Sequence, residues 1–186
     1  DIDIAFDPNT ANKFLIVHQD EGNSNFGTVI VGTVSSTSIS FGSAVVFNSG
    51  NTNVAIGLSF DKNTATKFVI AYKDNGNSNY VTIIEGTMGS TSVTFGSEIV
   101  INSAASSYPD VAFDPSSYGK FVVVYTDEGN SNYGTSRLGQ IATTEQLSNL
   151  TATNFLGTAT AAYTNGQTAS IMLKGGISDN QTSLTA

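Results

Sequence analysis

The stretch "DEGNSNYG", residues 127–134, is the third copy of a loop that occurs twice earlier in the chain. The earlier copies are "DEGNSNFG" at 20–27 and "DNGNSNYV" at 74–81. Asp and Asn side chains hydrogen-bond to nearby backbone, and Gly and Asn tolerate positive φ angles. The composition is therefore that of a tight hairpin turn, and its recurrence predicts the same turn at three equivalent places.

The residues around the loop recur with it. An "FD" motif places Asp at 7, 61 and 114, and the loop begins with Asp at 20, 74 and 127, so both move by 54 and then 53 residues. A fixed period of this length indicates stacked or radially arranged structural units. We predict repeat 1 over 1–53, repeat 2 over 54–109 and a partial repeat 3 over 110–149.

Each complete repeat is predicted to hold four short strands. In repeat 1 these are "IAFD", "KFLIV", "GTVIVGTV" and "ISFGSAVVF", rich in β-branched and aromatic residues and separated by turn residues. Helical periodicity is suggested only by "TTEQLSNL" at 143–150. The predicted fold class is all-β, with four-stranded antiparallel repeats of about 54 residues followed by a small C-terminal β module.

Four strands in a unit of this length resemble the blades of β-propellers of the kelch and Asp-box kinds. The Asp-box likeness is loose, because the loop aromatic follows the Asp by six positions here and by five in that motif. The third repeat lacks its fourth strand, and fewer than four blades do not close a ring. We therefore expect further blades to precede Asp1, or copies of this chain to complete one another as a homotrimer or a larger assembly, or the units to stack in a different way.

Residues 150–186 follow a different pattern. They hold two predicted strands, "NFLGTATAAY" and "TASIMLKGG", joined by "TNGQ", in which Asn-Gly is a strong hairpin signal. This segment resembles a β module of phage tail and virion proteins, most clearly at Asn165-Gly166-Gln167, Gly175-Gly176 and Asn180-Gln181. The family continues past the point where this chain stops, so we expect the module to be truncated.

The repeats resemble units found in marine phage and bacterial surface proteins, and this likeness covers nearly the whole chain. The resemblance implies a fibre or tail component on the exterior of a virion, and it carries over no catalytic residues. Its partners would be other virion proteins, copies of itself and a host-surface glycan. Two alternatives stay open: a bacterial extracellular adhesin or surface-filament protein, and a non-catalytic part of a glycan-degrading enzyme.

Composition argues against several partners. The chain has 7 Lys and Arg against 15 Asp and Glu, a net charge of −8, which disfavours nucleic acid and anionic membranes. No apolar run approaches the roughly 20 residues of a membrane-spanning helix, so membrane insertion is not expected. Without cysteine there is no disulfide framework or thiolate metal site.

No catalytic constellation is evident, and we predict neither an enzyme nor a cofactor. His18 is the only histidine, and its repeat equivalents are Tyr72 and Tyr125, which indicates an aromatic structural position. Arg137 is the only arginine and cannot form the arginine cluster of a sialidase. The recurring Asp residues belong to turns, so we do not expect them to form the pair of facing carboxylates that a glycosidase needs.

The candidate ligand-binding residues are instead the Asn-aromatic pairs that end the three loops. If the loops lie on one rim, amides beside aromatic faces would suit sugar rings. The pairs are Asn25 and Phe26, Asn79 and Tyr80, and Asn132 and Tyr133. Oxygen donors such as Asp20 and Asn23 could instead serve calcium, but one carboxylate with amides is a thin set, and the question of a metal stays open.

Overall fold

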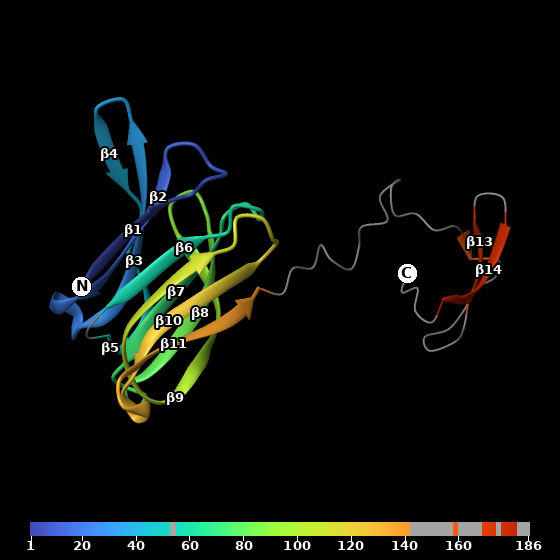
Figure 1. Cartoon of the computed structure of the whole chain (residues 1–186). Helices are drawn as coiled ribbons and strands as arrows, with labels where there is room; N and C mark the ends of the chain where they lie inside the picture. The colour runs from blue at the N-terminus through green and yellow to red at the C-terminus, as the bar shows by residue number, and fades with distance from the viewer. Residues whose placement is uncertain (53–54, 142–157, 160–168, 174–175, 182–186) are drawn as a thin grey trace. The chain divides into compact units, whose positions relative to one another are not determined.

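The computed structural model describes residues 1–52, 55–141, 158–159, 169–173 and 176–181 (Figure 1). The chain divides into two compact units, Asp1–Thr143 and Thr144–Ala186. All described sheets are antiparallel, and the helical residues of the described part form only two 3₁₀ turns, Glu21–Asn23 (η1) and Glu128–Asn130 (η2). The predicted all-β class is confirmed.

Repeat 1 forms a five-stranded sheet. Its strands are β1 (Ile2–Phe6), β2 (Lys13–Asp20), β3 (Phe26–Ser35), β4 (Ser38–Phe41) and β5 (Val45–Asn51). The order is β1-β2-β3-β4, and β5 also pairs with β3. The predicted fourth strand is thus split in two, because Gly42 and Ser43 lie against the turn at 89–92 of repeat 2, where Ser43 N–H donates to the Thr91 carbonyl at 3.1 Å.

The second sheet has six strands in the order β11-β10-β9-β8-β7-β6. They are β6 (Ile56–Phe60), β7 (Lys67–Asp74), β8 (Tyr80–Met88), β9 (Val93–Phe113), β10 (Lys120–Asp127) and β11 (Tyr133–Gln140). The long strand β9 crosses the predicted boundary between repeats 2 and 3, pairing first with β8 and then with β10. Repeats 2 and 3 therefore share one continuous sheet, with a register shift near Tyr108, whose φ is 53°.

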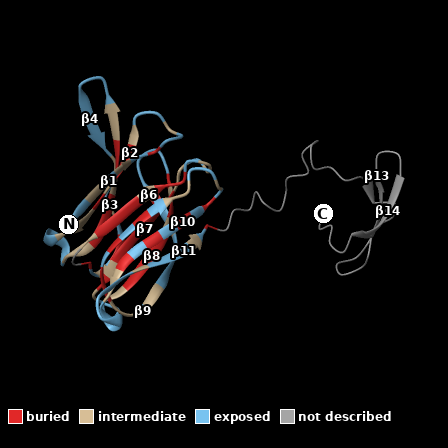
Figure 2. Ribbon diagram, in the orientation of Figure 1, coloured by how far each residue is buried: buried red, intermediate tan, exposed pale blue. Residues whose placement is uncertain are grey.

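Two apolar cores lie between successive repeats. The first joins one face of repeat 1, including Leu15, Val17 and Val29, to a face of repeat 2 that includes Leu58 and Tyr72. The second joins the opposite face of repeat 2 to repeat 3 through Val69, Ala71, Val111, Val123 and Tyr125. Figure 2 shows the buried residues concentrated on the middle strands, and strand alternation sends neighbouring residues to different cores.

A phenylalanine covers a glycine at the same place in every repeat. The directly opposed pairs are Phe14 and Gly32, Phe68 and Gly86, and Phe121 and Gly139. A Cβ added at Gly86 would lie 2.1 Å from the ring of Phe68, and the other two pairs are as close. Because these rings are buried, glycine is required opposite each of them.

The "FD" aspartates form equivalent turns. The Oδ1 atoms of Asp7, Asp61 and Asp114 accept the backbone N–H two residues later at 2.9, 2.8 and 2.8 Å. Asp61 is fully buried, and its Oδ2 also accepts Gly119 N–H of repeat 3 at 3.0 Å. These side chains are therefore structural turn residues, as the sequence predicts, and Asp61 also clasps two repeats together.

The C-terminal unit has a three-stranded sheet in the order β12-β13-β14, formed by Thr158–Ala159, Ala169–Leu173 and Gly176–Gln181. The antiparallel pairing of β12 with β13 agrees with the predicted hairpin. Its turn at Asn165-Gly166 and the helical segment at 143–150 lie outside the described residues. Strand β14 was not predicted, since "GISDNQ" combines residues that are poor strand formers.

We expect Gly86→Ala to destabilise the protein by about 1–3 kcal/mol, because the buried ring of Phe68 has no space into which it can move. Urea unfolding would measure the change. Gly96→Ala is the matched control, since a Cβ there meets only the Glu85 carbonyl oxygen at 3.9 Å. Equal effects of the two substitutions would contradict the proposed packing.

We expect Asp61→Ala to lower the free energy of unfolding by about 1–3 kcal/mol, since it leaves the N–H groups of Asn63 and Gly119 without their acceptor. Asp114→Ala removes the equivalent carboxylate where no further repeat covers it, so its effect should be clearly smaller. The same loss in both variants would show that the contact with Gly119 adds nothing.

Candidate functional site

The three recurring loops are hairpin turns of one design. Each follows the last paired residues of a hairpin, Asp20 with Phe26, Asp74 with Tyr80 and Asp127 with Tyr133. The Ser-Asn dipeptide before each aromatic has two successive left-handed residues, with φ of 56° for all three serines and 60–63° for the asparagines. The six-residue spacing from Asp to aromatic thus follows from the turn, since the two are cross-strand partners.

The loops line one edge of the stacked repeats. The loop of repeat 2 contacts the end of β5, where Asn75 N–H donates to the Asn51 carbonyl at 3.0 Å. The loop of repeat 3 contacts the middle of β9, and a Cβ on Gly129 would lie 2.6 Å from that of Ala104. The loops of repeats 2 and 3 therefore each touch the fourth strand of the repeat before them, and the loops follow one another along one rim.

The predicted Asn-aromatic pairs lie on this rim but remain separate. Phe26 and Tyr80 are half-buried, whereas Tyr133 is exposed. Among the described residues these three rings make no ring–ring contact with one another. The carbonyls of Asn25 and Asn79 accept Thr52 N–H and Ser106 N–H at 3.1 and 3.0 Å, so the backbones of both pairs are tied to a fourth strand. Asn132 is exposed beside Tyr133.

A polar hollow of about 360 Å³ opens where the loop of repeat 2 meets repeat 1. Its walls come from the end of β5, from the loop after β7 and from β9, and its lining residues are Asn48, Ser49, Gly50, Asp74, Gly76, Asn77 and Glu98. Gly50 and Gly76 bring two backbones together, because a Cβ on Gly50 would lie 3.3 Å from the Gly76 Cα.

Hydrogen bonds fix the acidic groups of this hollow. Oδ1 of the buried Asp74 accepts Gly76 N–H at 2.9 Å and Asn77 N–H at 3.2 Å. Beside it, the Tyr72 hydroxyl donates to Glu98 Oε1 at 2.7 Å. Burial, followed by the hydrogen bond to Glu98, raises the pKa of Tyr72 far above its usual range, so the phenol stays a donor. The hollow therefore offers oriented amide and carboxylate groups suited to hydroxyl-bearing ligands.

Sequence reasoning missed the half of this hollow that repeat 1 contributes. A signal was present, since "NSG" at 48–50 recurs as "NSA" at 102–104. What the sequence does not reveal is that these residues meet the loop of the following repeat. The second junction brings the equivalent strand and loop together through other contacts, with Asn102 donating to Ser106 Oγ at 3.0 Å and Lys73 Nζ lying 3.6 Å from Glu128 Oε1.

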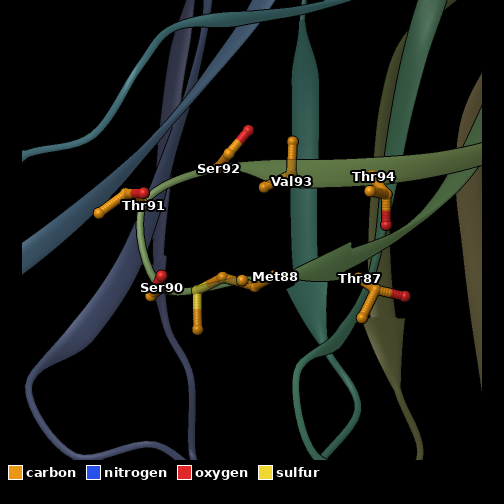
Figure 3. A pocket seen from close by; sticks show the side chains of 8 residues that line it. Thr87, Met88, Ser90, Thr91, Ser92, Val93 and Thr94 are labelled. Atoms are coloured by element: carbon orange, nitrogen blue, oxygen red, sulfur yellow. The ribbon is translucent and has the colours of Figure 1, made fainter.

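A second hollow, of about 290 Å³, lies beneath the turn between β8 and β9 (Figure 3). Its lining consists of Gly89 and hydroxyl residues together with Met88 and Val93, which belong to the core between repeats 1 and 2. The turn is held to repeat 1 by Lys13 Nζ, which donates to the Ser90 carbonyl. With no titratable side chain in its lining, this hollow is a packing junction.

The remaining titratable candidates are dispersed. His18 is half-buried at the position equivalent to Tyr72, and its Nδ1 lies 3.2 Å from the Gln19 carbonyl. The hydroxyl of Ser116 lowers the pKa of Asp114 to about 2, and burial raises the pKa of Glu85. Over residues 1–52 and 55–141, no three His, Cys, Asp or Glu side chains gather where they could hold a metal ion.

Family models, curated proteins and solved structures all show no match to this chain. The described part of the chain also holds no helix with the length and apolar character needed to cross a membrane.

We expect the protein to lose stability above pH 10, because the unfolded chain then releases the Tyr72 proton that the folded chain retains. One such group contributes a slope of at most about 1.4 kcal/mol per pH unit. Tyr72→Phe should remove that part of the slope in urea unfolding measured on both sides of pH 10. Tyr133→Phe, at an exposed position, should leave it unchanged, and identical slopes in wild type and Tyr72→Phe would contradict the assignment.

Proposed function

We propose that this chain is a structural component of a phage virion, a fibre or tail part on its exterior, whose loop rim attaches to host-surface glycan. The observation that carries the proposal is the polar hollow at the repeat junction, where Asn48, Asn77, Asp74 and Glu98 come together. Amides and carboxylates in such a hollow suit the hydroxyl groups of a saccharide, and the exposed Tyr133, which ends another loop of the same rim, offers an apolar ring face.

Repetition supports attachment rather than catalysis. Three equivalent loops along one rim give several weak contacts, which combine through effective concentration. Oδ1 of Asp74 already accepts hydrogen bonds from two backbone N–H groups. This carboxylate is therefore better suited to act as a fixed acceptor than as an acid that transfers a proton. We therefore propose a non-enzymatic role, with other virion proteins and copies of the chain as partners.

We further propose that the repeats are the blades of a propeller-like arrangement. The first strands of successive repeats are linked, since Leu58 N–H donates to Asp3 Oδ2 at 2.8 Å and Phe113 N–H to Ser59 Oγ at 3.2 Å. In a radial arrangement, the first strands of successive repeats lie side by side and the sheets pack face to face. A bacterial adhesin or surface filament would use the same surface, so the location of the protein separates the two proposals.

The glycan proposal predicts that the purified chain binds at least one member of a panel of bacterial O-antigen and capsular polysaccharides in biolayer interferometry. We expect Asn77→Ala and Tyr133→Ala to weaken that binding about tenfold, equivalent to about 1.4 kcal/mol. Tyr118→Ala is the control, because Tyr118 is similarly exposed but lies at the opposite end of β10.

Absence of binding across the panel, or an equal loss in the Tyr118→Ala variant, would contradict attachment through the loop rim. Location is tested separately by labelling purified virions with an antibody raised against residues 1–141. Label on cell envelopes without virions would favour the adhesin.

A further inference from the structure

The two cores between repeats use the same two faces in the same order. We call the surface of a repeat that meets the preceding repeat its leading face; in repeat 2 it includes Ile56, Leu58, Phe60, Ile70 and Tyr72. The trailing face meets the following repeat, and in repeat 2 it consists of Val69, Ala71, Val81 and Ile83. Both contacts within the chain thus pair a trailing face with the leading face of the next repeat.

The leading face of repeat 1 has no cover. Ile2, Ile4 and Phe6 are 71, 55 and 58% exposed. Their equivalents 54 residues later are the buried Ile56, Leu58 and Phe60, at 8, 7 and 7%. Ile39 and Phe41 extend the exposed surface, and a contiguous apolar area of this kind marks an interaction site.

The trailing face of repeat 3 is open in the complementary way. Val122 and Val124 are 41 and 46% exposed, whereas their equivalents in repeat 2, Val69 and Ala71, are fully buried. Leu138 on β11 belongs to the same face and is exposed. Over residues 1–52 and 55–141, the repeats therefore present one unmatched face of each kind, at opposite ends.

The hydrogen bond that joins repeats 2 and 3 has its equivalent groups open at the same two ends, although the junction of repeats 1 and 2 lacks this bond, since Asp7 Oδ2 there has no partner. Between repeats 2 and 3, Asp61 Oδ2 accepts the N–H of Gly119, a residue with a φ of 64°. In repeat 3 the equivalent acceptor, Asp114, has no further repeat beside it. In repeat 1 the equivalent donor position is the exposed Asn12, which has nearly the same φ of 63°.

We infer that two copies of this chain associate head to tail, with the trailing face of repeat 3 in one copy on the leading face of repeat 1 in the other. The occupant is a second copy because the internal interfaces show twice which face fits which, and residues 1–52 and 55–141 leave one face of each kind exposed. Asp114 of one copy would then accept Asn12 N–H of the other. Such a contact is heterologous, so it closes into a ring or continues as a filament.

This inference rests on the repeat interfaces and goes beyond the proposed attachment function, so either can fail without the other. The test uses the full 186-residue chain and two variants, Ile4→Glu on the leading face and Val124→Glu on the trailing face. Both positions are exposed in the single chain, so each variant should fold. Val100→Glu, at a position 42% exposed outside both open faces, is the control.

We expect wild type and Val100→Glu to sediment above the chain mass of 19.4 kDa in analytical ultracentrifugation. Each of the other two variants should sediment as a single chain. An equimolar mixture of them should form a species of two chains that grows no further, because only one intact trailing–leading pair can form. Circular dichroism and thermal unfolding would verify folding, with Ile2→Glu and Leu138→Glu as replacements if a variant does not fold.

A wild-type chain that stays single at every concentration would overturn the inference. So would self-association that only one of the two variants abolishes, since that result describes a symmetric contact of one face with itself. Polysaccharide binding is measured separately and does not affect either outcome.

Discussion

Repeat 2 is apolar on both faces of its sheet, and this property requires repeats 1 and 3 to pack on either side of it. In β7, the four consecutive residues Val69, Ile70, Ala71 and Tyr72 are all fully buried. A strand with apolar residues on both sides needs a packing partner on each face of its sheet. Parallel sheets are commonly covered on both faces, whereas an antiparallel sheet must be stacked between two other layers to achieve this. Repeats 1 and 3 supply the two covers, so no single repeat provides a stable core by itself.

That constraint also creates the candidate binding site. Because sheets stack face to face, the hairpin loop of one repeat is pressed against the fourth strand of the repeat before it. Gly50 and Gly76 allow the two backbones to approach closely. The polar residues around these glycines line a hollow that is open to solvent. The hollow therefore arises from the junction and is not a property of one loop.

The end repeats show what happens where stacking stops. His18 stands where repeats 2 and 3 have a buried tyrosine, and it is only half-buried. Asp114 stands where Asp61 is enclosed, and the hydroxyl of Ser116 donates to its carboxylate and lowers its pKa. Similar residues thus have different surroundings, depending only on whether a neighbouring repeat is present.

The fold class and the local turns can be predicted from the amino-acid sequence. Period-two apolar patterns, the 54- and 53-residue steps and the Asp, Asn and Gly residues of the loops act over a few neighbouring positions, so they can be interpreted without knowing the fold. It also indicated the loop residues later found on one rim, such as Asn79 and Tyr80.

How the repeats join cannot be predicted from local sequence signals. That β9 runs through from repeat 2 to repeat 3, that Gly42 divides a strand, and that Asn48 and Glu98 meet the loop at Asp74 all depend on contacts between residues far apart in the chain. Similar repeats have similar patterns of apolar and turn residues, so the sequence does not show which face of a repeat another repeat covers. The burial of equivalent residues distinguishes the repeats, because burial depends on which neighbour packs against each face.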